Sequence, residues 1–281
     1  MANRRLIALD LDGTLLDDQG RLPKENKRIL QQFSQEGAII ALASGRMTDC
    51  IVPFAQKLGI DCAIIAYNGA MVKTREKEGR ALILHEPLPA TYGDLLIDYC
   101  RQHCFHLNYY LNDVLYARGV QQLKKYARIY SRQTGAVVHF VPDLKVFRGK
   151  SPTKLILITD VVNEKEPFRT RDSQYEFFQK KLGGQVNLFR TNPEYLEFLK
   201  KGVGKAAGLV KLAEFYRINK ADTIAFGDGE NDAEMLAVAG IGVAMANAAA
   251  KTKECAKVIL PWSNSQAGVA KFLENLARES V

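Results

Sequence analysis

Short apolar segments alternate with amphipathic segments at both ends of this chain of 281 residues. The apolar segments have no polar side, so they indicate β-strands that are buried on both faces. These strands are expected at residues 5–10, 38–44, 62–67, 223–228, 241–245 and 257–260. The amphipathic segments indicate helices at residues 23–36, 48–58, 203–217, 230–239 and 267–277. Buried strands joined by helices predict the α/β class, with a doubly wound parallel sheet.

The middle of the chain has a different pattern, because expected strands follow one another directly. Helices are expected at 91–103, 120–134 and 166–182, and strands at 105–110, 114–117, 136–141, 154–159, 185–190 and 195–199. This order predicts an α+β sheet that helices cover on one face. We therefore expect a discontinuous core domain, 1–87 and 191–281, with a smaller domain, 88–190, inserted into it.

The formal net charge of +8 is concentrated in that middle region. Residues 88–190 hold 16 Lys and Arg against 9 Asp and Glu, which leaves the rest of the chain almost neutral. The basic residues occur singly or in pairs and do not alternate with aromatic residues, so no nucleic-acid partner is predicted. A cationic surface that attracts an anionic substrate is the alternative to a merely solvated face.

The cysteines and the hydropathy indicate the compartment. The chain has 5 Cys, an odd number in a chain too large to need disulfides, so reduced thiols are expected. The group Cys100, His103, Cys104 and His106 has the residue types of a zinc site, but its spacing matches no usual zinc motif. No apolar run is long enough to span a bilayer, and Asp10 interrupts the N-terminal one. We expect a soluble, cytoplasmic protein without a membrane partner.

Polar residues follow three of the expected core strands. They are Asp10 to Thr14 in "DLDGT", Ser44 to Arg46 in "SGR", and Asp228 to Asp232 in "GDGEND". In an open parallel sheet, ligands bind where the strands end, near the point at which the strand order reverses. The three motifs are therefore expected to meet at one edge of the sheet.

The residue types at that edge indicate phosphate chemistry. Several carboxylates without Cys or His favour Mg²⁺ over zinc. The hydroxyls of Thr14 and Ser44 and the ammonium group of Lys205 suit a phosphate, although Lys200 or Lys201 could replace Lys205. Asp10, at the strand end, is the best placed nucleophile for an aspartyl-phosphate intermediate. Asp12, two residues along extended backbone, is expected on the same side, where it would protonate the leaving oxygen and then activate water.

The motifs "DLDGTL", "SGR", "KGVGK" and "GDGEND" resemble the four motifs of the haloacid dehalogenase superfamily, in particular its Cof-type phosphatases with a type IIB cap. The resemblance extends over essentially the whole chain, because "YNGA", "YLEFLKKGVGK" and "GVAMANA" are also similar to that branch. It implies a Rossmann-like core, an α/β cap and Mg²⁺-dependent hydrolysis of phosphate monoesters.

The resemblance also implies roles for individual residues. Asp10 would be nucleophile and metal ligand, and Asp12 would be general acid/base and metal ligand through its main-chain carbonyl. Asp228 would be a further metal ligand, supported by Asp232. The residues expected to bind the phosphate are Leu11, Thr14, Ser44, Gly45, Lys205 and Asn231. Two positions differ from the residue types that relatives commonly carry there: Gln266-Ala267 and Gly204. Neither is part of the expected reaction centre.

The inserted domain is expected to act as a lid, which favours a small phosphorylated metabolite such as a sugar phosphate as substrate. A monomer or weak homodimer is expected. A dehalogenase would not need Asp12, whereas a phosphomutase and a non-catalytic sugar-phosphate-binding module remain alternatives. For Arg46 a surface ion pair is the alternative to a role in the site, and Asn68-Gly69 is expected to form a turn.

Overall fold

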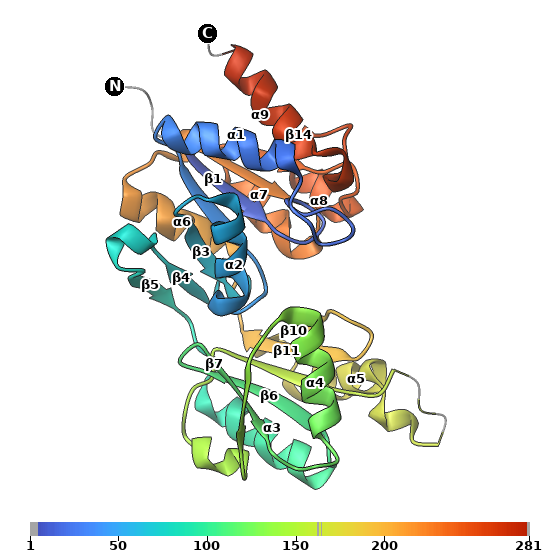
Figure 1. The fold of residues 1–281 in the computed structure, drawn as a ribbon. Coiled ribbons are helices and arrows are strands. Elements are labelled where there is room, and N and C mark those ends of the chain that lie inside the picture. The colour runs from blue at the N-terminus through green and yellow to red at the C-terminus, as the bar shows by residue number, and fades with distance from the viewer. Residues whose placement is uncertain (1–4, 162, 164, 280–281) are drawn as a thin grey trace. The chain divides into compact units, whose positions relative to one another are not determined.

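The computed structural model of this chain describes residues 5–161, 163 and 165–279. It contains two compact units, Met1–His85 with Gly204–Val281, and Glu86–Val203 (Figure 1). The second boundary differs from the predicted one at 190/191, because β11 (Tyr195–Lys200) pairs with β10 (Val186–Arg190) and β9 (Lys154–Ile158). A boundary at 191 would cut the hairpin that β10 and β11 form.

The first unit contains an eight-stranded sheet in the order β14-β13-β12-β1-β2-β3-β4-β5. Its strands are β1 (Leu6–Asp10), β2 (Ile39–Ala43), β3 (Ala63–Ala66), β4 (Met71–Lys73), β5 (Leu82–His85), β12 (Thr223–Gly227), β13 (Ile241–Ala244) and β14 (Val258–Ile259). The strands from β14 to β3 are parallel, as predicted, and β4 and β5 add an antiparallel hairpin. The chain proceeds from β1 to β2 on one side and from β12 to β13 on the other, so the strand order reverses between β1 and β12.

Helices cover both faces of this sheet. They are α1 (Lys24–Gln35), α2 (Thr48–Leu58), α6 (Lys205–Tyr216), α7 (Ala233–Val238), α8 (Ala250–Cys255) and α9 (Gly268–Glu279). Leu6 and Ala8 of β1 pack in one apolar cluster with Leu209 and Leu212 of α6. Because side chains alternate along a strand, Asp10 at the end of β1 faces α6 as well. Helix α8 was not predicted, since its short sequence AKTKEC has no apolar face.

The second unit contains a six-stranded sheet in the order β10-β11-β9-β6-β7-β8, antiparallel except for the β7–β8 pair. The remaining strands are β6 (His106–Leu111), β7 (Val114–Arg118) and β8 (Val138–Val141), and the helices are α3 (Ala90–Gln102), α4 (Lys124–Thr134) and α5 (Arg171–Leu182). The predicted mixed α/β class, with a second sheet, is confirmed. No helix within the described residues has the length and apolar character needed to cross a membrane.

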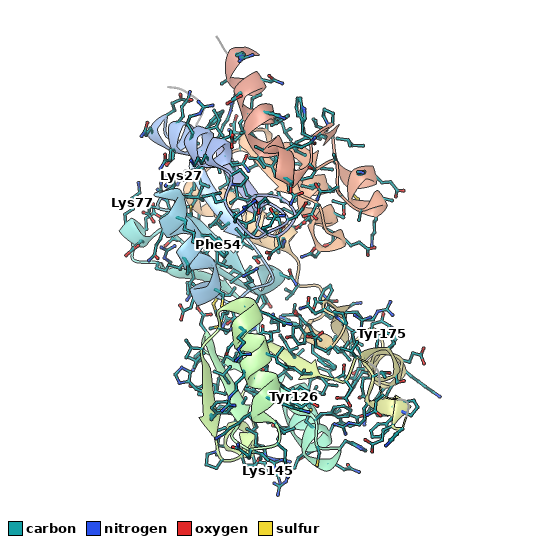
Figure 2. All side chains as sticks on the ribbon, turned by 45° about the vertical axis from the view of Figure 1, so that its right-hand side comes forward. Lys27, Phe54, Lys77, Tyr126, Lys145 and Tyr175 are labelled. Carbon is teal, nitrogen blue, oxygen red and sulfur yellow. The ribbon has the colours of Figure 1, made fainter. Side chains whose placement is uncertain are left out.

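The second sheet has helices on both faces, so the prediction of one covered face is wrong. On one face, Leu107 and Tyr109 of β6 pack in an apolar cluster with residues of α3 and α5. On the other face, the Tyr110 hydroxyl donates to the Tyr130 hydroxyl of α4 at 2.6 Å. Figure 2 shows Tyr126 on α4 and Tyr175 on α5. Because side chains alternate along a strand, the adjacent Tyr109 and Tyr110 point to opposite faces, and each is buried there.

Candidate active site

Lys205 and two carboxylates form a buried cluster at the carboxyl end of β1. Lys205 is the first residue of α6, and its Nζ lies 2.5 Å from Asp10 Oδ1 and 2.6 Å from Asp232 Oδ1. The exposed fractions of the three side chains are 0% for Lys205, 9% for Asp10 and 1% for Asp232. The structure thus selects Lys205, whereas Lys200 pairs with Glu86 in the second unit.

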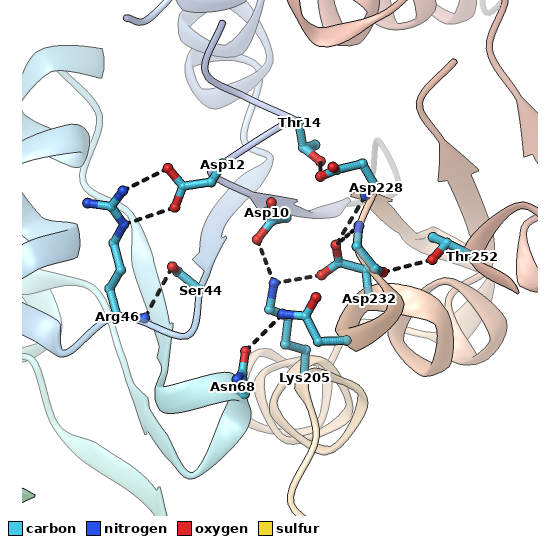
Figure 3. A network of polar contacts seen from close by, with 12 residues as sticks. Asp10, Asp12, Thr14, Ser44, Arg46, Asn68, Lys205, Asp228, Asp232 and Thr252 are labelled. Carbon is cyan, nitrogen blue, oxygen red and sulfur yellow. Dashed lines mark hydrogen bonds and ion pairs between the residues drawn. The ribbon is translucent and has the colours of Figure 1, made fainter. Parts of the chain in front are cut away.

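Asp228 and Asp232 complete the acidic side of this cluster, in the loop that follows β12 (Figure 3). The Thr14 hydroxyl donates to Asp228 Oδ1 at 2.8 Å, and Asp232 Oδ2 accepts from the backbone N–H groups of Asp228 and Gly229 at 3.1 and 3.0 Å. Gly13 is required beside them, because its φ is +83° and a Cβ there would lie 2.3 Å from Asp228 Oδ2. The motifs after β1 and β12 are therefore in direct contact.

This cluster has more negative than positive charge. Burial raises the pKa of Asp10 well above its usual range, against the attraction of Lys205. Burial, together with the charge of Asp232, raises the pKa of Asp228 to about 6. The pKa of Lys205 is raised by Asp10 and Asp232, although burial alone would lower it. One ammonium group cannot balance three carboxylates, so the cluster favours a further cation.

The donor set fits Mg²⁺. One carboxylate oxygen each from Asp10, Asp228 and Asp232 lie within 4.8 Å of one another. All three donors are hard oxygen ligands, which Mg²⁺ prefers. Asp232 already accepts hydrogen bonds at both of its oxygens, from Lys205 and from the backbone, and its carboxylate is therefore better suited to orienting the site than to direct ligation.

Asp12 lies at the same edge, but it pairs with a different cation from Asp10. Arg46 binds both Asp12 oxygens, with Nε 2.9 Å from Oδ2 and Nη2 2.7 Å from Oδ1. The Asp12 side chain is 56% exposed, in contrast to Asp10. The expectation of extended backbone through Asp12 does not hold, because β1 ends at Asp10 and the chain turns there. Figure 3 shows the Asp12 carboxylate directed toward Arg46 and that of Asp10 toward Lys205.

The residues predicted to bind phosphate lie around this cluster. Ser44 is buried after β2, and its hydroxyl accepts from the Arg46 N–H at 3.3 Å. Leu11 is also buried, and its carbonyl accepts from the Leu16 N–H at 2.9 Å. Thr14 differs from the prediction, because its hydroxyl is bound to Asp228 and thereby orients a carboxylate. The sequence shows the order of the motifs but not the direction of the Thr14 hydroxyl, so it could not distinguish binding of phosphate from orientation of Asp228.

Three asparagines hold the loop that carries Asp12 to Thr14, and sequence reasoning missed all of them. Asn247 donates to the Gly13 carbonyl at 2.8 Å, Asn26 to the Leu15 carbonyl at 3.1 Å, and Asn264 to the Leu16 carbonyl at 2.9 Å. Asn26 and Asn264 are buried. Satisfied buried amides make this loop rigid. Only the similarity of "GVAMANA" to the Cof-type branch pointed toward Asn247.

Asn68 is a further residue of the site that was expected only to form a turn. It follows β3, and its Oδ1 accepts from Asn231 Nδ2 at 3.0 Å. The candidate zinc residues, in contrast, do not form a site. Cys100 is buried in the apolar cluster of the second unit, and the ring of His106 is bound to Asn108.

Comparison with known proteins agrees with this geometry. Residues 7–273 match the family described as haloacid dehalogenase-like hydrolase. The chain is 28% identical over 273 residues to the 5-amino-6-(5-phospho-D-ribitylamino)uracil phosphatase YitU of Bacillus subtilis (strain 168), covering 96% of each chain. It is also 26% identical to phosphatase YwpJ of the same organism, covering 97% of this chain and 99% of that one.

Solved structures show the same fold. TM0651 from Thermotoga maritima has a TM-score of 0.83 and 30% identity, with 97% of each chain covered. A haloacid dehalogenase-like hydrolase from Bacteroides thetaiotaomicron has a TM-score of 0.84 and 27% identity, covering 97% of this chain and 99% of that one. The fold is also that of BT4131, described as a subclass IIB sugar phosphatase, at a TM-score of 0.78 and 20% identity, covering 97% of this chain and 99% of that one. The predicted resemblance is confirmed: this chain belongs to the family of haloacid dehalogenase-like hydrolases.

Proposed function

We propose that this chain hydrolyses phosphate monoesters of small metabolites through an aspartyl-phosphate on Asp10. The observation that carries the proposal is the position of Asp10: a carboxylate at the carboxyl end of the central strand, 2.5 Å from a fully buried lysine. Membership of a hydrolase family, with relatives named as phosphatases, supports the same reaction.

The Asp10 carboxylate would attack phosphorus, forming an O–P bond while the bond from phosphorus to the substrate oxygen breaks. Lys205 holds Asp10 by Oδ1 and so fixes the direction of the carboxylate. Asp232 holds Lys205 in turn. In the second step water attacks phosphorus, the Asp10 O–P bond breaks, and inorganic phosphate leaves.

Asp12 would supply the proton to the leaving oxygen and then take one from the attacking water. In the structure both of its oxygens bind Arg46. Asp12 must therefore release at least one Arg46 contact before it can serve the substrate. The Asp12 side chain is exposed and the Arg46 side chain is 25% exposed, so water can replace these bonds at low cost.

Asp10, Asp228 and the Asp12 main-chain carbonyl would hold the Mg²⁺ ion, with Asp232 orienting them through Lys205 and the loop backbone. When bound, the ion offsets the surplus negative charge and lets an anionic phosphate approach a carboxylate. Ser44, Gly45, Lys205 and Asn231 would bind the phosphate oxygens. We infer that Thr14 serves Asp228 instead, because its hydroxyl already donates there.

The names of the relatives support a substrate class. YitU is named for a phosphorylated ribitylamino compound, as are two further relatives at 27% and 26% identity. We propose a phosphorylated polyol or sugar derivative as the substrate. The inserted unit is proposed to act as the lid that the sequence predicts, with no nucleic-acid or membrane partner.

The first test measures release of inorganic phosphate from p-nitrophenyl phosphate and a panel of phosphorylated metabolites, with Mg²⁺. We expect turnover in the wild type, none after addition of EDTA, and none in Asp10→Asn. Product analysis separates the alternatives: an isomeric sugar phosphate in place of inorganic phosphate would indicate a phosphomutase. Absence of turnover on the whole panel would favour a binding module and contradict the proposal.

The second test concerns Asp12 and compares two leaving groups. p-Nitrophenolate is stable as an anion, whereas the alkoxide of a sugar must be protonated as it leaves. Asp12→Asn should therefore reduce kcat/KM, which reports only the steps up to departure of the leaving group, much more for a sugar phosphate than for p-nitrophenyl phosphate. Equal losses on both substrates would remove Asp12 from the role of proton donor.

A further inference from the structure

Three successive residues after β3 have left-handed backbone. The φ values are +53° for Tyr67, +54° for Asn68 and +96° for Gly69, and all three residues are buried. Asn tolerates this region, but a bulky residue such as Tyr seldom adopts it, and each strained residue costs about 1–3 kcal/mol. Such a conformation persists only where the surrounding contacts determine it.

The backbone of this turn holds the loop after β2. The N–H of Tyr67 donates to the Arg46 carbonyl and the N–H of Asn68 donates to the Ser44 carbonyl, both at 3.0 Å. In this turn, two successive N–H groups are directed toward one loop. The loop they hold includes Ser44 and Gly45, which are proposed to bind phosphate.

The side chain of Asn68 reaches a second loop. Its Oδ1 accepts from Asn231 Nδ2 at 3.0 Å across 163 positions of sequence, and it lies so close to Gly45 that a Cβ there would be 3.1 Å away. Gly69 approaches a third segment, since a Cβ on it would lie 2.1 Å from the carbonyl oxygen of Gly204, immediately before Lys205. One turn therefore contacts all three segments that carry the proposed phosphate ligands after β1.

We propose that Asn68 is a positioning residue for phosphoryl transfer, acting through Asn231. The Asn231 amide has two N–H donors. Asn68 accepts one of them and so fixes the direction of the other, which is left to bind phosphate. The same side chain sets the distance between Asn231 and the Ser44–Arg46 loop. This role rests on the proposed function, and it is assigned by no motif of the sequence.

The test is Asn68→Gly, which removes the amide and keeps a residue that accepts left-handed backbone. We expect kcat to fall about 10- to 100-fold, as for other residues that orient a ligand, with a smaller change in KM. The inhibition constant of inorganic phosphate should rise, and Tm should stay close to that of the wild type. Arg217→Gly is the matched control: Arg217 is exposed, has φ +55°, and ends α6 far from Lys205. It should leave kcat and KM unchanged.

A double-mutant cycle shows whether Asn68 acts through Asn231. Asn231→Ala should reduce kcat in the wild type and have little further effect in Asn68→Gly. Asn68→Asp keeps the acceptor oxygen, so in that background Asn231→Ala should again cost at least as much as in the wild type, because a carboxylate is the stronger acceptor. The repulsion between the added charge and phosphate is present with and without Asn231, so it affects both rates of this comparison. This second cycle also answers the question if Asn68→Gly proves too unstable to assay.

Two failures can be told apart. A wild type that hydrolyses no phosphate ester contradicts the proposed function itself. An active wild type with an equally active Asn68→Gly, or with additive losses in the cycle, overturns the positioning role and leaves the proposed function intact.

Discussion

Each unit of this chain buries a lysine against carboxylates, and the two sites differ in charge balance. In the first unit, Lys205 bridges Asp10 and Asp232, and Asp228 lies beside them. In the second unit, Lys154 lies 3.2 Å from Glu197 Oε2, and its Nζ is 5.2 Å from the centre of the Tyr110 ring. The first group has three carboxylates for one ammonium group, whereas Lys154 and Glu197 carry one charge of each sign.

The difference separates a structural ion pair from a reaction site. Glu197 also accepts from the Thr191 hydroxyl at 3.2 Å. Both of its carboxylate oxygens therefore have polar partners within the second unit. A balanced buried pair needs no ligand. Burial, together with the neighbouring negative charges, raises the pKa values of Asp10 and Asp228. The surplus negative charge around Lys205 favours an external cation. Burial of a lysine alone therefore does not indicate a catalytic role. An excess of carboxylates around the buried lysine does.

The largest effect is expected from Asp10→Asn, which removes the nucleophile. Phosphate release should fall by about four orders of magnitude or more, because the group that forms the intermediate is lost. Initial rates with Mg²⁺ measure this. Asp222→Asn is the control, since Asp222 precedes β12 at the opposite edge of the same sheet. Substantial activity in Asp10→Asn would assign the nucleophile to another residue.

Lys205→Met should come next, with a fall in kcat of about 10²–10³-fold, because a preorganised cation beside the nucleophile and phosphate is lost. Lys211→Met is the matched control on the same helix, where the side chain is 43% exposed. If both variants behaved alike, the Lys205 cluster would be no more than a packing feature.

Lys154→Met tests the other side of the comparison. It leaves Glu197 buried without its partner, and the free energy of unfolding should fall by about 3–5 kcal/mol, while kcat of the folded enzyme is unchanged. The double variant Lys154→Met/Glu197→Leu should regain most of that stability. Chemical denaturation and kcat, measured on the same samples, check both statements. A lower kcat without a loss of stability would place Lys154 in substrate binding.

The smallest effect concerns pH. The pKa of Asp228 is raised to about 6 by burial, so the folded chain binds this proton more tightly than the unfolded chain does. Without metal, the contribution of Asp228 to stability is present at low pH and is lost as pH rises from about 4 through about 6. Mg²⁺ binds the ionised form, so the rise in Tm that it causes should grow over this range. Melting curves with Mg²⁺ and with EDTA measure this rise, and Asp228→Asn should remove the increase between about pH 4 and 6, leaving only the pH dependence of Asp10, whose pKa is also raised.

Much of the core could be predicted because its signals are local. Apolar runs such as the one before Asp10 have no polar face, so they predict strands that are buried on both faces of the sheet. The ends of parallel strands meet at one edge, which is why residues as distant as Asp10 and Asp232 could be expected together. The boundary at 190/191 was misplaced because a strand pattern does not reveal its pairing partner, and Tyr195–Lys200 pairs with strands of the second unit.

The sequence by itself determined the parallel core, the order of the motifs and the acidic, lysine-containing composition of the site, since these depend on periodicity and on chain order. Only the tertiary structure decided which partner each polar group takes: Arg46 for Asp12, Asp228 for Thr14, and Asn231 for Asn68. Hydrogen bonds act over about 3 Å and depend on direction. Their pairing is therefore set by how the loops fold onto one another, which no local pattern encodes.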